Sequence, residues 1–197
     1  MKNMEKLKDN GFSILYMEHL FFDSICQNSL NLYYDNPAAG MPKDLEIYLE
    51  SLDAGFKRGS GIRGKPVVRG FGFKELVETA IENNIRVIGI DTTTSYAMGN
   101  AGGAQDFGAE GKDRISGMNY QACKIINKTA NGNKWFSLMG NAHISLHEDT
   151  PGVADLLDVP AILIQEKSEL ENLQIHNEPS TQIAGHDIFS QIQLEGN

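Results

Sequence analysis

The chain has 197 residues, of which 41% are hydrophobic and 22% are charged, so it can bury one sizeable core. Its net charge of −9 argues against nucleic acid or an anionic membrane as the main partner, because phosphate binding requires clustered Lys and Arg. Two cysteines without a CxxC motif argue against a disulfide framework, and no apolar run approaches the ~18 residues of a membrane span.

The first third of the chain alternates strand and helix patterns. A short apolar run predicts a strand at 12–17, and a looser helical pattern follows over 21–32. Pro42 marks the start of a second helix, with Gly55 beyond its end. Residues 55–72 then form a glycine-rich loop that holds five Lys and Arg residues. This loop either closes over an anionic ligand or is a solvated surface loop.

The middle of the chain repeats this alternation. The patterns predict a helix at 73–83, a strand at 85–90, a second helix at 114–127 and a strand at 135–139. The segment 91–112 is long, polar and rich in glycine, which is typical of a functional or mobile loop.

The last part of the chain predicts a short helix at 153–157, a fourth strand at 160–164, and an edge strand or tail at 187–194. Alternating strands and helices are typical of a parallel sheet with right-handed crossovers. We therefore expect one α/β domain over residues 1–165, with a mostly parallel sheet of about four to five strands flanked by helices. Residues 166–197 would be a polar extension.

Polar residues follow the first three predicted strands, namely Glu18 and His19, then Asp91, then Asn141 and His143. Because the carboxyl ends of parallel strands lie at one edge of a sheet, we expect these residues to form one rim site. A carboxylate beside an imidazole makes an acid–base pair, and His143 is then either a second base or an electrophilic donor. Asp91, which opens a run of threonines, is alternatively a turn or cap residue.

This predicted site depends on one condition of backbone geometry and has one alternative, a metal site. Adjacent side chains on an extended strand point to opposite faces, so Glu18 and His19 share a pocket only if the chain turns immediately after Met17. Two histidines and a carboxylate also match the ligand set of catalytic zinc, although no HExxH motif is present. We expect no cofactor, with a divalent metal on Glu18, His19 and His143 as the alternative.

The predicted helix at 114–127 adds two further candidates. Arg114 and Asn119 would bring a guanidinium and an amide to the same rim, where Arg114 would clamp a carboxylate or phosphate. An ordinary salt bridge at the start of the helix explains Arg114 equally well.

Two phrases, Tyr16-Met-Glu-His19 and Gly140-Asn-Ala-His143, resemble the paired Gly-x-x-His-like motifs of a superfamily. This superfamily groups erythromycin esterases, ChaN-like haem-binding lipoproteins, TIKI proteases and a C-terminal domain of Pasteurella multocida toxin and related large toxins. The second phrase fits well, and residues 152–157 resemble the family's closing helix. The first has Tyr16 in place of the usual glycine. The helix that carries Arg114 is similar to the family's arginine helix, and the resemblance covers roughly residues 12–165.

The resemblance implies a Rossmann-like domain of a bacterial toxin or secreted effector that acts in the host cytosol or in the bacterial cytoplasm. A larger toxin polypeptide that contains this domain is consistent with the resemblance. It does not fix the chemistry, because the superfamily spans ester hydrolysis, metal-dependent proteolysis and haem binding. Our leading hypothesis is hydrolysis of an ester or amide bond in a small molecule or host protein. In this hypothesis His19 would be the general base that activates water, and Glu18 would orient His19 or share its proton. His143 with Arg114 would stabilise the developing negative charge. Asp91, Asn119, Asn141 and Tyr16 would line the substrate site. A TIKI-like metal-dependent protease and a non-catalytic module that binds haem, lipid or a host protein are the alternatives.

Overall fold

A computed structural model describes residues 3–59, 72–98, 109–147, 149–165 and 180–184. The chain forms two compact units, and each is described by itself. The first unit comprises residues 1–93 and 125–138, and the second comprises residues 94–124 and 139–197.

The first unit is built on a three-stranded parallel sheet of β1 (Phe12–Phe21), β2 (Arg86–Asp91) and β3 (Lys134–Leu138). The strand order is β2-β1-β3, so the chain leaves β1 first to one side and later to the other. Such a reversal of strand order is a topological switch point, and open α/β sheets bind ligands at the carboxyl ends of the strands there. The predicted α/β fold class is confirmed.

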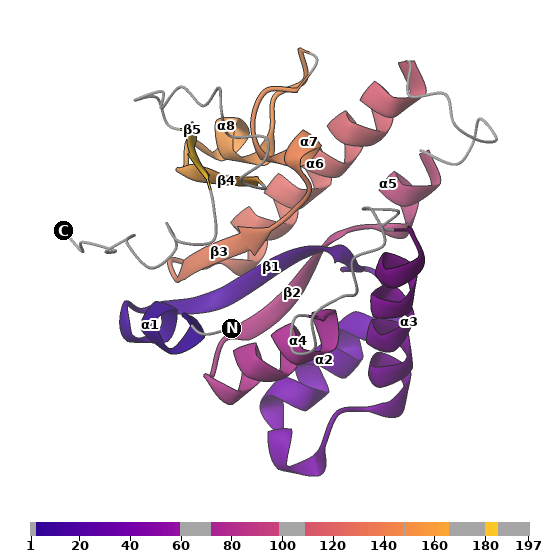
Figure 1. The fold of residues 1–197 in the computed structure, drawn as a ribbon, viewed down its shortest axis with the longest axis vertical. Helices are drawn as coiled ribbons and strands as arrows, with labels where there is room; N and C mark the ends of the chain where they lie inside the picture. The colour runs from indigo at the N-terminus through magenta and orange to yellow at the C-terminus, as the bar shows by residue number, and fades with distance from the viewer. Residues whose placement is uncertain (1–2, 60–71, 99–108, 148, 166–179, 185–197) are drawn as a thin grey trace. The chain divides into compact units, whose positions relative to one another are not determined.

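Three helices pack with β1 and β2 in the first unit, namely α2 (Ile25–Asp35), α3 (Lys43–Gly59) and α4 (Phe73–Glu82) (Figure 1). They share one hydrophobic core with the strands, to which β1 contributes Leu15, Met17 and Leu20, all fully buried. The short helices α1 (Met4–Asp9) and η1 (Pro37–Ala39) complete this part of the chain. Burial of this apolar face is the main stabilising term for the three helices.

Helices α3 and α4 are joined by charged groups as well as by the core. Asp53 accepts a hydrogen bond from the backbone nitrogen of Phe73 at 2.7 Å, which satisfies a donor at the start of α4. The Nζ of Lys74 lies 2.7 Å from Glu46, and Lys43 lies 2.7 Å from the other oxygen of the same carboxylate. The hydrogen bonds from these two lysines lower the pKa of Glu46 from 4.5 to about 2.

The Glu46 network predicts a stability term that depends on pH. Because the folded-state pKa of Glu46 is depressed, its contribution is present above 4.5 and is lost as the pH falls through about 2. We expect Glu46→Gln to lower the melting temperature slightly at pH 7, with a smaller effect at high salt because Lys43 is exposed and Lys74 and Glu46 are partly exposed. Thermal melts between pH 7 and pH 2 test this, and a deficit of the variant that persists at pH 2 would contradict it.

The second unit contains α5 (Thr93–Met98), most of α6 (Ala109–Thr129), α7 (Asn141–Ile144) and α8 (Val153–Leu157). Two further strands, β4 (Ala161–Gln165) and β5 (Ser180–Ala184), form a separate two-stranded parallel sheet. The fourth predicted strand therefore exists, but it pairs with β5 and not with the first three strands. Because β5 lies in the polar stretch after residue 165, the apolar pattern gave no sign of it.

Several predicted boundaries move in the structure. β1 continues four residues beyond the predicted end at Met17, and α2 accordingly begins at Ile25. α3 runs past Gly55 to Gly59, and the predicted loop 91–112 contains α5 and the start of α6. In each case hydrogen bonding and tertiary packing outweigh a local polar or glycine signal.

Three other expectations are not tested in the structure. Most of the basic loop and the predicted strand at 187–194 lie outside the described residues, and the division into 1–165 and 166–197 stays a prediction. Among the described helices, none is both long and apolar enough to span a membrane.

Candidate functional site

Glu18 and His19 lie inside β1, not past its end as the sequence predicted. Met17 pairs with Gly89 and Phe21 pairs with Asp91. Between these two pairs β1 advances by four residues, whereas β2 advances by only two. The strand therefore bulges at Glu18, His19 and Leu20. Bulges re-aim side chains and are over-represented beside active sites. The chain does not turn after Met17, but the bulge interrupts the strict alternation that would separate Glu18 from His19.

The bulge is held from the helix side of the sheet. The ring of His19 packs against Phe73 of α4, with 4.7 Å between the ring centroids. The hydroxyl of Tyr48 on α3 donates a hydrogen bond to the carbonyl oxygen of His19 at 3.0 Å. Leu20 belongs to the core cluster against which Phe73 packs, so consecutive residues of the bulge both reach the helices.

Gly89 on the neighbouring strand makes room for the bulge. A Cβ atom at this position would collide with the backbone carbonyl of Leu20. Only glycine allows β2 to pass so close to the bulged backbone, and an isolated glycine within a strand is typical of such a close approach. Sequence reasoning missed this residue, although its position inside an apolar strand was a usable signal.

Asp91 is the last residue of β2 and is 2% exposed. Its Oδ1 accepts a hydrogen bond from the backbone nitrogen of Thr92 at 2.7 Å, and its carbonyl oxygen accepts one from Phe22 at 2.9 Å. These bonds fit the turn role that the sequence left open, and a substrate role for Asp91 stays a prediction.

Tyr16 is fully buried in the first unit. Its ring packs edge-on against Trp135 at 5.5 Å, and its hydroxyl lies 2.8 Å from Oγ1 of Thr129. Because Thr129 donates its own hydroxyl proton to the carbonyl of Ile125 at 2.7 Å, Tyr16 must be the donor to Thr129. Burial raises the pKa of the phenol above its ordinary value.

In the second unit, the structure brings together two of the predicted site residues, His143 and Asn119. Nδ1 of His143 lies 2.8 Å from Oδ1 of Asn119, and Nδ2 of Asn119 donates to the carbonyl oxygen of Pro151 at 2.8 Å. His143 is 8% exposed and Asn119 is 1% exposed. The pair joins α6 to α7 and to the segment before α8.

The segment around His143 folds tightly on itself. The backbone nitrogen of His143 donates to the carbonyl of Gly140 at 2.9 Å, and His147 exchanges two backbone hydrogen bonds with Thr150. Gly152 comes so close that a Cβ there would collide with the backbone of Ile144 and Ser145. The position of His143 is therefore fixed by backbone contacts as well as by Asn119.

Arg114 and Asn141 complete the predicted set. The guanidinium of Arg114 lies over the ring of Tyr96 on α5, 5.8 Å from its centroid, which is a cation–π contact. Asn141 is the first residue of α7, and its side chain lies outside the described part. Glu18, His19, Asp91 and Tyr16 belong to the first unit, whereas Arg114, Asn119, Asn141 and His143 belong to the second.

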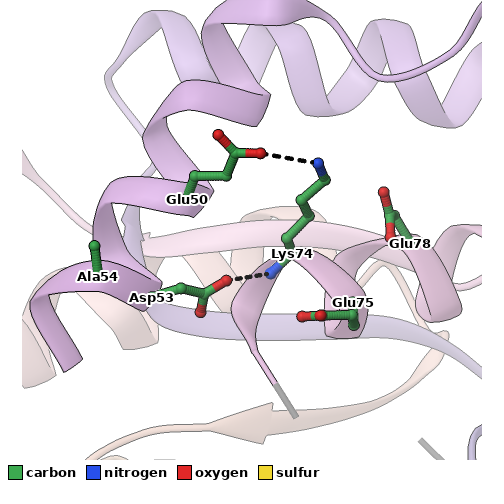
Figure 2. A pocket seen from close by; sticks show the side chains of 6 residues that line it. All are labelled: Glu50, Asp53, Ala54, Lys74, Glu75 and Glu78. Atoms are coloured by element: carbon green, nitrogen blue, oxygen red, sulfur yellow. Dashed lines mark hydrogen bonds and ion pairs between the residues drawn. The ribbon is translucent and has the colours of Figure 1, made fainter. Parts of the chain in front are cut away.

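A surface pocket of about 340 Å³ lies between α3 and α4 and contains none of the predicted site residues (Figure 2). Its lining is Glu50, Asp53, Ala54, Lys74, Glu75 and Glu78. Lys74 lies 3.1 Å from Glu50, and Glu75 accepts a hydrogen bond from the backbone nitrogen of Gly72 at 3.1 Å. These groups already serve to join and cap the two helices.

Within the described parts of the chain, no group of three or more His, Cys, Asp or Glu side chains is placed to hold a metal ion. The alternative metal set of Glu18, His19 and His143 draws on both units, and it stays a prediction.

Searches with protein-family models and with curated proteins gave no match to the chain. Solved structures do resemble it. RRSP, a MARTX toxin effector domain from Vibrio vulnificus CMCP6, is 23% identical with a TM-score of 0.61, over 81% of this chain and 28% of that one. The C-terminal region of Pasteurella multocida toxin, described with a thiol-protease-like catalytic triad, is 18% identical with a TM-score of 0.57, over 81% and 20%.

A third structure, described as bacterial protein toxins, is 20% identical with a TM-score of 0.57, over 81% of this chain and 29% of that one. The chain thus spans less than a third of each of these toxin structures, and at such identities the likeness establishes a shared fold. The resemblance to toxin domains is supported, whereas the wider resemblance to erythromycin esterases, ChaN-like proteins and TIKI proteases is not confirmed.

Proposed function

We propose that the chain is an effector domain of a larger bacterial toxin that hydrolyses an ester or amide bond inside host cells. The observation that carries this proposal is the fold shared with toxin structures, one of them the MARTX effector domain RRSP. Two local features support a reactive site on that fold. One is the bulge at Glu18 and His19 near the end of the central strand, and the other is the buried pair of His143 and Asn119.

In this proposal His19 is the general base that activates water, and Glu18 orients His19 or shares the proton of His19. Arg114 carries a permanent positive charge and stabilises the developing negative charge. His143 either shares this role or acts as a second base. Asp91, Asn141 and Tyr16 keep their proposed places in the substrate site. The substrate is a small molecule or a host protein, and nucleic acid is disfavoured by the net charge of −9.

A thiol-protease-like triad, as described for the C-terminal region of Pasteurella multocida toxin, fits this chain less well. Burial raises the pKa of both cysteine thiols, Cys26 on α2 and Cys123 on α6. Because the thiolate is the nucleophile in thiol catalysis, a raised pKa works against it. Water activated by histidine is the better match to these residues.

A metal-dependent version of the same activity is the second candidate. It is favoured by the contact of His143 with Asn119, since a metal-binding histidine usually donates its second ring N–H to a fixed acceptor. Activity that survives chelation in a protein free of metal by elemental analysis would eliminate this version.

The test of the proposal is expression of the chain in cultured eukaryotic cells. We expect the wild-type chain to impair growth and the double variant His19→Ala/His143→Ala to be harmless at equal abundance, since loss of a general base costs about 10²- to 10⁴-fold in rate. His147→Ala is the matched control, because it removes a third imidazole from the segment that follows α7, three residues beyond the end of the helix that carries His143. Circular dichroism should give the same spectrum for all three proteins.

Two results would count against the proposal in different ways. A wild-type chain that is harmless at high abundance would contradict the effector function. A double variant as toxic as the wild type would contradict the assignment of the two histidines.

A further inference from the structure

The environment of Asn119 fixes which way its amide group points. The partner of its Nδ2 is the carbonyl oxygen of Pro151, 2.8 Å away, and a carbonyl oxygen can only accept a hydrogen bond. The NH₂ group must therefore face Pro151, because the reverse orientation would place two acceptor oxygens in contact. The amide oxygen consequently faces His143.

The orientation of Asn119 in turn fixes the proton on His143. Oδ1 of Asn119 lies 2.8 Å from Nδ1 of the imidazole and offers only lone pairs, so Nδ1 must carry the hydrogen. In a neutral imidazole one nitrogen is a donor and the other an acceptor. With the proton on Nδ1, the lone pair lies on Nε2.

We infer that Asn119 is a positioning residue that holds His143 in the Nδ1–H tautomer, so that Nε2 is its proton-accepting or metal-ligating atom. Both polar ends of the Asn119 side chain face protein partners, which assigns it to His143 and not to a substrate. An amide oxygen holds Nδ1–H without the negative charge that a carboxylate would bring, so the arrangement suits a neutral ring. Given the proposed hydrolase function, on which this last step rests, His143 is the second base rather than the electrophilic donor.

Burial makes this arrangement firm. Asn119 is 1% exposed and His143 is 8% exposed, so a broken contact would leave polar atoms with little access to water. The close approach of Gly152 to Ile144 and Ser145 holds the backbone on both sides of the pair.

Nitrogen NMR of the ¹⁵N-labelled chain tests the inference without any activity assay. Long-range ¹H–¹⁵N spectra at pH 8, above the ordinary histidine pKa of about 6.5, distinguish protonated from unprotonated ring nitrogens. We expect the His143 ring of the wild type to have a protonated Nδ1 and an unprotonated Nε2. Asn119→Ala should shift the population towards the Nε2–H tautomer that predominates in free histidine.

Ser116→Ala, an exposed change one turn earlier on α6, is the control and should give the wild-type spectrum. A wild-type ring protonated at Nε2 alone, or an Asn119→Ala spectrum identical to that of the wild type, would overturn the inference. If Asn119→Ala fails to fold, the wild-type spectrum still decides. An Nδ1–H ring in a chain without toxicity would refute the proposed function and the role of His143 as second base, and would leave the tautomer assignment intact.

Discussion

Tyr16→Ala is expected to destabilise the first unit by about 3–5 kcal/mol, the usual cost of truncating a fully buried aromatic side chain. The change removes the edge-on contact with Trp135 and the hydrogen bond to Thr129. Because a domain is stable by only about 5–15 kcal/mol, this loss is a large fraction of the total. Urea denaturation followed by circular dichroism measures it. Fluorescence is a poor probe here, because Trp135 is the only tryptophan and touches the altered residue.

Tyr16→Phe separates packing from the hydroxyl group. It keeps the ring and leaves Oγ1 of Thr129 without its donor, so we expect a loss of about 1–1.5 kcal/mol. A Tyr16→Ala variant within 1 kcal/mol of the wild type would show that the residue is not part of the core. A Tyr16→Phe variant of normal stability that lacks activity would instead support the sequence-based expectation that the phenol serves the substrate site.

The architecture of the first unit follows from patterns that are visible in the sequence. Buried parallel strands are continuous apolar runs, and those near 12–17, 85–90 and 135–139 all form strands of one sheet. The helices behind them are amphipathic and were predicted with small errors at their ends. Apolar periodicity is decisive here because burial of that face is what stabilises the elements.

The pairing of strands was not predictable in the same way. β4 has the expected apolar pattern but pairs with β5, whose sequence Ser-Thr-Gln-Ile-Ala is largely polar. Likewise β1 extends through Glu18 and His19 because its backbone continues to pair with β2, as at Phe21 and Asp91. Backbone hydrogen bonds carry no side-chain signature, so a hydropathy pattern places such ends wrongly.

For the candidate site, the sequence identified residue types but not their contacts. His143 and Asn119 were both candidates, yet they lie 24 residues apart on different elements, and only the fold joins them. The supporting residues were missed, because their contacts involve the backbone. Pro151 accepts a hydrogen bond through its backbone carbonyl, and Tyr48 donates one to the backbone carbonyl of His19. Such roles depend on a neighbour's position and are invisible in a single sequence.

Gly89→Ala is expected to cost about 3 kcal/mol, the upper end of the range for overpacking, and to displace the bulge that carries Glu18 and His19. The added Cβ would collide with the carbonyl group of Leu20, which is backbone and cannot rotate away as a side chain would. Relief requires β1 and β2 to separate or the bulge to shift. Either movement would disturb the hydrogen bond from Tyr48 to the carbonyl of His19.

Two measurements distinguish this mechanism from general destabilisation. Urea denaturation gives the free energy of unfolding, and amide chemical shifts in the folded variant report where the backbone has moved. We expect the largest shifts at residues 18–21, with faster hydrogen exchange there. Ser13→Ala, on β1 before the bulge, adds no atoms and should stay within about 0.5 kcal/mol of the wild type. If Gly89→Ala retained wild-type stability and unchanged shifts at 18–21, then β2 would not control the bulge, and the placement of Glu18 and His19 would have to depend on the helix-side contacts of Tyr48 and Phe73 alone.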